Sequence, residues 1–110
     1  MKVAIAGYGT VGGGVARILE KNAQTIARRA GVPLELGAIL VRRDFPGDPF
    51  EKHMVRDFSA IENDDSTQVV VETIGGCGAA LDICVRALRR GKHVVTANKQ
   101  LVAEHGAELI

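Results

Sequence analysis

The chain of 110 residues has no tryptophan, two cysteines, three prolines and only 4% aromatic residues. Its 14 basic and 13 acidic side chains nearly cancel, so no net charge attracts nucleic acid or an anionic membrane surface. No window approaches the roughly 20 apolar residues of a membrane span, and the apolar run before Gly7 is too short for a signal peptide. We therefore expect neither nucleic-acid nor membrane partners.

The few cysteines and histidines predict no metal site. Cys77 and Cys84 form neither a Cys-x-x-Cys pair nor a repeated framework, which favours a reducing, cytoplasmic location. On one helix they would lie about 10 Å apart along the axis, at ~1.5 Å per residue, which is too far for one metal ion to bridge. His53, His93 and His105 show no ligand spacing either.

Glycine is in excess, since 13 of the 110 residues, or about 12%, are glycine where roughly 7% is usual. Four of the 13 fall between Gly7 and Gly13. A short apolar run at residues 3–6 ends at Gly7, as expected for a strand buried on both faces. Helical spacing then runs from Val11 to Ile26, where Thr10 can cap the start and Gly31 the end. The pattern indicates a strand, a tight turn and a long helix.

The rest of the chain continues this alternation. Three more strands are expected at residues 34–41, 68–73 and 92–96, and mostly loop at 44–65, with a short element around 51–58. A helix follows the third strand, its apolar face formed by Leu81, Cys84, Val85 and Leu88, and a last helix starts near Asn98. Strands alternating with helices predict one α/β domain over residues 1–110, a Rossmann-like doubly wound parallel sheet with helices on both faces.

The residues Gly7-Tyr8-Gly9-Thr10-Val11-Gly12 match the pattern G-x-G-x-x-G. Alone the pattern is weak, but here it follows a buried strand and opens a helix. In that context the first glycine permits the tight turn, the second lets the backbone approach a pyrophosphate, and the third lets helix and strand pack closely. The competing interpretation is an ordinary strand-to-helix turn. We expect a dinucleotide site.

The end of the second strand bears on the choice of cofactor. NAD sites usually offer an acid there, whereas sites for the 2′-phosphate of NADP offer arginine. Arg42 and Arg43 precede the only acid, Asp44, which favours NADP over NAD. The arginines could instead be a solvated strand end, and Asp44 could still serve NAD.

Two further turns face the same edge of the sheet. Ile74 and Gly75 follow the third strand, and small residues there let a flat ring approach the backbone. Lys99 follows the fourth strand at a helix N-terminus, where a substrate oxygen or a phosphate would be favoured, although it could be an ordinary solvated lysine. We expect Glu72 to accept hydrogen bonds from the turn after it and Cys84 to pack in the core.

These segments carry a family resemblance. Residues 3–15, 70–76 and above all 87–101, with GKHVVTANK at 91–99, resemble the amino-terminal nucleotide-binding domain of homoserine dehydrogenase. Members of that family interconvert aspartate 4-semialdehyde and homoserine with NAD(P), in threonine and methionine biosynthesis. The resemblance implies that Lys99 is catalytic, polarising the aldehyde oxygen or relaying its proton. It also implies a cofactor site lined by Tyr8, Thr10, Val11, Thr96 and Asn98.

The resemblance covers only part of such an enzyme. The family's substrate-binding and dimerisation region follows this domain, and only four strands are clear here where six are usual. We therefore expect a truncated oxidoreductase that binds cofactor but does not catalyse alone, and whose full-length form is a homodimer. Two alternatives stay open, a stand-alone NAD(P)-sensing module and the nucleotide domain of another semialdehyde or amino-acid dehydrogenase.

Overall fold

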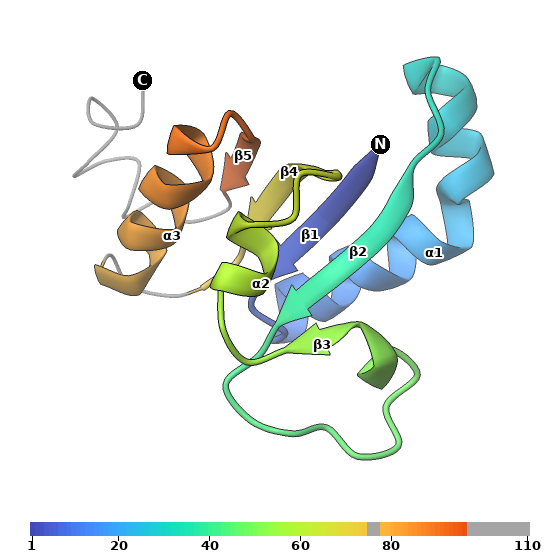
Figure 1. Cartoon of the computed structure of the whole chain (residues 1–110). Helices are drawn as coiled ribbons and strands as arrows, with labels where there is room; N and C mark the ends of the chain where they lie inside the picture. Colours follow the sequence, from blue (N-terminus) through green and yellow to red (C-terminus); the bar gives the residue numbers. More distant parts are fainter. Residues whose placement is uncertain (75–77, 97–110) are drawn as a thin grey trace.

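The computed structural model describes residues 1–74 and 78–96 and shows a parallel sheet of five strands between helices (Figure 1). The strands are β1 (Lys2–Ala6), β2 (Glu35–Leu40), β3 (Met54–Val55), β4 (Thr67–Glu72) and β5 (His93–Thr96). The helices are α1 (Thr10–Ala30), the 3-10 helix η1 (Glu51–His53), α2 (Ser59–Glu62) and α3 (Gly78–Arg89). The four strands expected from the sequence are confirmed. The two-residue β3 and the short α2 lie in the segment expected to be mostly loop.

The strand order β3-β2-β1-β4-β5 shows that the sheet is doubly wound. From β1 the chain adds β2 and β3 on one side, and it then returns to add β4 and β5 on the other side. The strand order therefore reverses between β1 and β4. In open α/β sheets, ligands bind outside the carboxyl ends of the strands at such a reversal.

Each face of the sheet has its own hydrophobic core. Ala4 and Ala6 of β1 face α2 and α3, where they pack with Phe58 and Ile83. The intervening Ile5 points to the other face, in a cluster that includes Ala16 of α1, Ile39 and Phe50. Because neighbouring strand residues point to opposite faces, the continuous apolar run in β1 serves both cores. Figure 1 shows α1 on one side of the sheet and α2 with α3 on the other.

The apolar faces of the two long helices agree in part with those expected, since Val15 and Leu19 of α1 and Leu81 and Cys84 of α3 pack in the cores. Helix α3 buries Ala80, Ile83, Cys84 and Ala87, whereas Leu88 is 38% exposed. On α1 the expected Val11 and Ile18 are more than half exposed, and Gly12 and Ala16 are buried instead. Small residues let both helices lie close to the sheet. A prediction based on large apolar residues therefore misses part of each buried face. The expected core position of Cys84 in α3 is confirmed.

A glycine with a positive backbone angle follows each of the two long helices, as expected for Gly31. Gly31 follows α1 with φ +76° and Gly91 follows α3 with φ +76°, a conformation that glycine adopts without strain. Helix α1 is kinked at Asn22, where the backbone leaves helical geometry. The expected helix after Asn98 lies outside the described residues.

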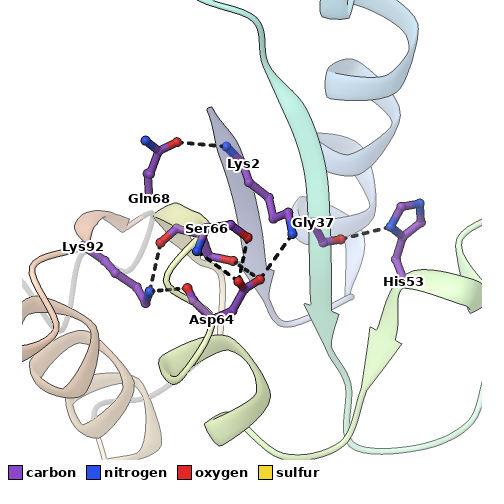
Figure 2. A network of polar contacts seen from close by, with 8 residues as sticks. Lys2, Gly37, His53, Asp64, Ser66, Gln68 and Lys92 are labelled. Carbon is purple, nitrogen blue, oxygen red and sulfur yellow. Dashed lines mark hydrogen bonds and ion pairs between the residues drawn. The ribbon is translucent and has the colours of Figure 1, made fainter.

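A polar network joins the amino-terminal ends of the strands (Figure 2). The Asp64 carboxylate accepts hydrogen bonds from the Ser66 hydroxyl at 2.6 Å, the Thr67 hydroxyl at 2.9 Å and the Lys2 ammonium at 3.3 Å. The buried ammonium of Lys92 donates to the carbonyl oxygens of Asp64 and Thr67 at 2.8 and 2.9 Å. Because the two carbonyl oxygens hold the Lys92 ammonium within the fold, we assign the network a structural role, on the edge of the sheet opposite the glycine-rich turn.

Candidate functional site

The glycine-rich turn after β1 is held in a geometry that two of its glycines require. Gly7 has φ +106°, and its amide donates to the Leu40 carbonyl oxygen at 3.0 Å. A Cβ on Gly12 would lie 2.2 Å from the Gly7 carbonyl oxygen and 2.9 Å from the Thr73 hydroxyl. The sequence prediction of a tight turn at the first glycine and close packing at the third is confirmed.

At Gly9 the fold itself does not require glycine. It is exposed, its backbone is not in the left-handed region, and a Cβ there would meet no described atom within 4 Å. The space beside the Gly9 backbone is therefore open at the N-terminus of the 21-residue α1. Helix N-termini offer amide donors and a positive dipole end to anions, so the turn fits a pyrophosphate.

The turn after β4 lies beside the glycine-rich turn. The Thr73 amide donates to the Ala6 carbonyl oxygen at 2.9 Å, and its hydroxyl donates to the same oxygen at 3.0 Å. The fully buried Glu72 carboxylate accepts the Ile74 amide and the Thr96 hydroxyl, both at 2.5 Å. The interpretation of Glu72 as an acceptor for the following turn is confirmed. Through Thr96, Glu72 also connects the ends of β4 and β5.

These turns surround a cleft of about 1120 Å³ at the carboxyl edge of the sheet. Apolar side chains form part of its wall, including Leu40, Phe58 and Ile83. Residues after the strands and the start of α3 also line it: Gly7, Tyr8 and Gly9 after β1, Val41, Arg42, Arg43 and Phe45 after β2, Arg56 and Asp57 after β3, Thr73 and Ile74 after β4, and Ala79 of α3. The cleft thus combines an apolar wall with a cationic end and a glycine turn.

Three arginines form the cationic end. Arg42 and Arg43 are exposed, and the Arg43 guanidinium carbon lies 4.1 Å from the centre of the Phe45 ring. Arg56 pairs with Asp44, with 2.9 Å between Nη1 and Oδ1, although both side chains are more than half exposed. Sequence reasoning missed Arg56, because it follows a strand of only two residues that no periodicity reveals.

The other expected site residues are distributed as follows. Of the described residues, the cleft lining includes Tyr8 and Ile74 but not Thr10, Val11 or Thr96. Thr10 and Val11 are exposed in the first turn of α1. Gly75, Asn98 and Lys99 lie outside the described residues.

Within residues 1–74 and 78–96, no group of three or more His, Cys, Asp or Glu side chains could hold a metal ion. Over that same part of the chain, no helix has the length and apolar character needed to cross a membrane.

Comparison with known proteins decides the family. Residues 7–110 match the family model described as "Homoserine dehydrogenase, NAD binding domain". The chain belongs to this family. The domain's cofactor is accordingly a nicotinamide dinucleotide, in agreement with the glycine turn and the cleft beside it.

Individual homoserine dehydrogenases show the same likeness. The enzyme of Pseudomonas aeruginosa is 46% identical over 110 residues, which cover 99% of this chain and 25% of the relative. A crystal structure of S. aureus homoserine dehydrogenase at pH 7.0 superposes with a TM-score of 0.86 at 38% identity, over 99% of this chain and 29% of that one. The structure from Thiobacillus denitrificans gives a TM-score of 0.86 at 38% identity and covers 26% of that chain. This chain thus spans about a quarter of the length of its curated relatives.

Proposed function

We propose that residues 1–110 are the cofactor-binding domain of an NAD(P)-dependent homoserine dehydrogenase, which interconverts aspartate 4-semialdehyde and homoserine in threonine and methionine biosynthesis. The observation that carries the proposal is the contrast within the glycine turn. Gly12 is packed against the Gly7 carbonyl, whereas the space at Gly9 is open. The match to the family model and the likeness to solved homoserine dehydrogenases support the same assignment.

Each of the three turns would bind a different part of the cofactor. Gly7, Gly9 and Gly12, with the start of α1 at Thr10 and Val11, would hold the pyrophosphate. Arg42 and Arg43 would hold the adenosine end, and the nicotinamide would lie toward Ile74, Gly75, Thr96 and Asn98. When bound, the reduced cofactor supplies the hydride that converts the aldehyde to the alcohol. In this proposal Lys99 polarises the aldehyde oxygen or relays its proton.

We propose NADP as the preferred cofactor over NAD. Arg42, Arg43 and Arg56 line one end of the cleft, and the first acid after β2, Asp44, is paired with Arg56. An anion at this end, such as a 2′-phosphate, would meet three guanidinium groups, one of them paired with Asp44, and the single carboxylate of Asp57. A fluorescence titration of the chain with NADPH and NADH tests the preference. Arg42→Ala and Arg43→Ala should weaken NADPH binding and leave NADH binding unchanged, whereas NADH binding tenfold tighter than NADPH in the unmodified chain would contradict it.

The chain alone should bind cofactor without turning over substrate. Hydride transfer requires the reacting carbons to be held at roughly 3–3.5 Å. The family resemblance places the acids that bind the amino acid, and the homodimer interface, in the region that follows this domain in the family. Detectable homoserine oxidation by the purified 110 residues would contradict this division. The cytoplasmic location stays a prediction from the low cysteine content.

A further inference from the structure

The Tyr8 side chain reaches from the glycine-rich turn to a loop 40 residues further along the chain. Its hydroxyl donates to the Asp48 carboxylate, at 2.8 Å from Oδ1 and 3.0 Å from Oδ2. Burial and the Asp48 carboxylate raise the pKa of Tyr8, against an opposing effect of Arg17. Hydrogen bonds to a charged acceptor are stronger than neutral ones.

The loop at residues 44–50 is organised around this contact. Asp48 Oδ1 also accepts the Phe50 amide at 2.8 Å, and the Asp48 amide donates to the Phe45 carbonyl oxygen at 3.1 Å. The Tyr8 ring meets Phe45 edge to face at 5.1 Å between centroids and Phe50 at 6.4 Å. Phe50 is 5% exposed and belongs to the core beneath α1. Tyr8 therefore fixes the loop through one hydrogen-bonded carboxylate and two rings.

One residue held by this loop lines the cationic end of the cleft. The Arg43 guanidinium stacks on the Phe45 ring at 4.1 Å, and the same ring meets Tyr8 edge to face. A continuous series of contacts therefore runs from Asp48 to Tyr8, Phe45 and Arg43. Tyr8 belongs to the glycine turn, so the position of Arg43 is tied to the position of the turn.

We propose that Tyr8 and Asp48 are positioning residues for cofactor selection, holding the 44–50 loop against the glycine turn so that Arg43, stacked on Phe45, meets the 2′-phosphate of NADPH. The inference rests on the proposed function and deepens it. Loosening the loop removes a preformed cation from the adenosine end and leaves the pyrophosphate turn, whose shape depends on Gly7 and Gly12, in place. The Arg43 side chain must then be ordered during binding, and this loss of conformational entropy weakens the affinity for NADPH alone.

Two conservative variants test this by fluorescence titration of the chain with NADPH and NADH. Tyr8→Phe keeps the ring and removes the hydroxyl, and Asp48→Asn keeps the size and removes the charge. We expect NADPH affinity to fall about fivefold in Tyr8→Phe, as loss of a ~1 kcal/mol hydrogen bond implies, and by a smaller factor in Asp48→Asn, whose amide oxygen still accepts from Tyr8. NADH affinity should stay within about twofold in both. Ser66→Ala is the matched control, since it deletes a hydroxyl that donates to a carboxylate on the opposite edge of the sheet and should change neither affinity.

A double variant separates positioning from a general structural role. In the Arg43→Ala background, Tyr8→Phe should have no further effect on NADPH affinity, because the group that Tyr8 positions is already absent. Phe45→Leu, which removes the ring under Arg43, should reproduce the loss of preference and serves if Asp48→Asn does not fold. An unchanged NADPH to NADH ratio in Tyr8→Phe and Phe45→Leu, or an equal loss of both cofactors, would overturn the inference and leave the proposed function standing. If the unmodified chain binds neither cofactor, the proposed function fails with it.

Discussion

Gly12→Ala should lower the stability of the chain, whereas Gly9→Ala should weaken cofactor binding and leave stability nearly unchanged. The two residues lie three positions apart in one turn, yet the added methyl group meets different surroundings. At Gly12 the new Cβ would lie 2.2 Å from the Gly7 carbonyl oxygen and 2.9 Å from both the Gly7 carbonyl carbon and the Thr73 hydroxyl. At Gly9 it would meet no described atom within 4 Å.

The magnitude at Gly12 follows from what would have to move. Ordinary contacts to a Cβ begin near 3.4 Å, so the Gly7 carbonyl would have to shift by roughly 1 Å. That carbonyl belongs to the backbone between β1 and α1, and it cannot rotate away as a flexible side chain could. Overpacking of this kind costs about 1–3 kcal/mol, which in a domain of this size lowers the Tm by about 4–20 °C.

For Gly9→Ala we expect a Tm within about 2 °C of the unmodified chain, because the backbone is unstrained and the space is open. NADPH affinity should nevertheless fall at least about tenfold, since the methyl group occupies the position that lets the pyrophosphate approach the backbone. Differential scanning calorimetry and fluorescence titration measure the two quantities. Gly14→Ala is the control, because its Cβ would meet only the end of the Arg17 side chain at 4.0 Å, and alanine favours the helix.

Two outcomes would refute this reasoning. Gly9→Ala with unchanged NADPH affinity would mean that the open space is not where the cofactor approaches the chain. Gly12→Ala with unchanged Tm would mean that the close packing of turn and helix does not constrain the fold.

Two further predictions concern groups outside the cleft. Hydrogen bonds from Ser66, then Thr67, hold the pKa of Asp64 well below its usual range, so its stabilising effect is present above the unfolded-state pKa of about 4 and is lost as the pH falls below it. Asp64→Asn should therefore lower the free energy of unfolding by about 1–2 kcal/mol at pH 7 and flatten its decline in acid, and a variant as stable as the unmodified chain in urea titrations at pH 7 would contradict this. Burial raises the pKa of Cys84 to about 11, so a thiol reagent at pH 8 should label it only on unfolding. The Cys77→Ser variant leaves Cys84 as the one thiol, and rapid labelling of this variant in its folded state would contradict the prediction.

The elements with local signals were predictable from the sequence. The unit of β1, glycine turn and α1 combines an apolar run, a turn motif, helical spacing and a terminal Gly31, and each feature acts within a few residues. The two-residue β3 has no such signal, because it exists only through pairing of Met54 and Val55 with Ile39 and Leu40 of β2. The predicted face of α3 was right for Leu81 and Cys84 but missed Ala80 and Ala87, whose small side chains are fully buried.

The same distinction holds for the site. Arg42 and Arg43 stand next to a recognisable strand end, and their place in the cleft follows from the rule for parallel sheets. Arg56 reaches the cleft only because β3 adds to the sheet edge, and Asp48 meets Tyr8 only because the 44–50 loop folds back over the turn. Such contacts depend on tertiary structure, and the sequence around these residues resembles that of any polar loop.

An NMR titration of the ¹⁵N-labelled chain with NADPH tests the central claim most directly, because it reports where binding occurs as well as whether it does. We predict the largest amide shifts at Gly7 and Gly9, at Arg42 and Arg43, and at Ile74, all at the carboxyl edge of the sheet. Amides around Asp64 and Lys92, at the opposite edge, should not move. Absence of shifts at millimolar NADPH, or shifts centred on the Asp64 network, would contradict the assignment of this turn and cleft to a nicotinamide dinucleotide.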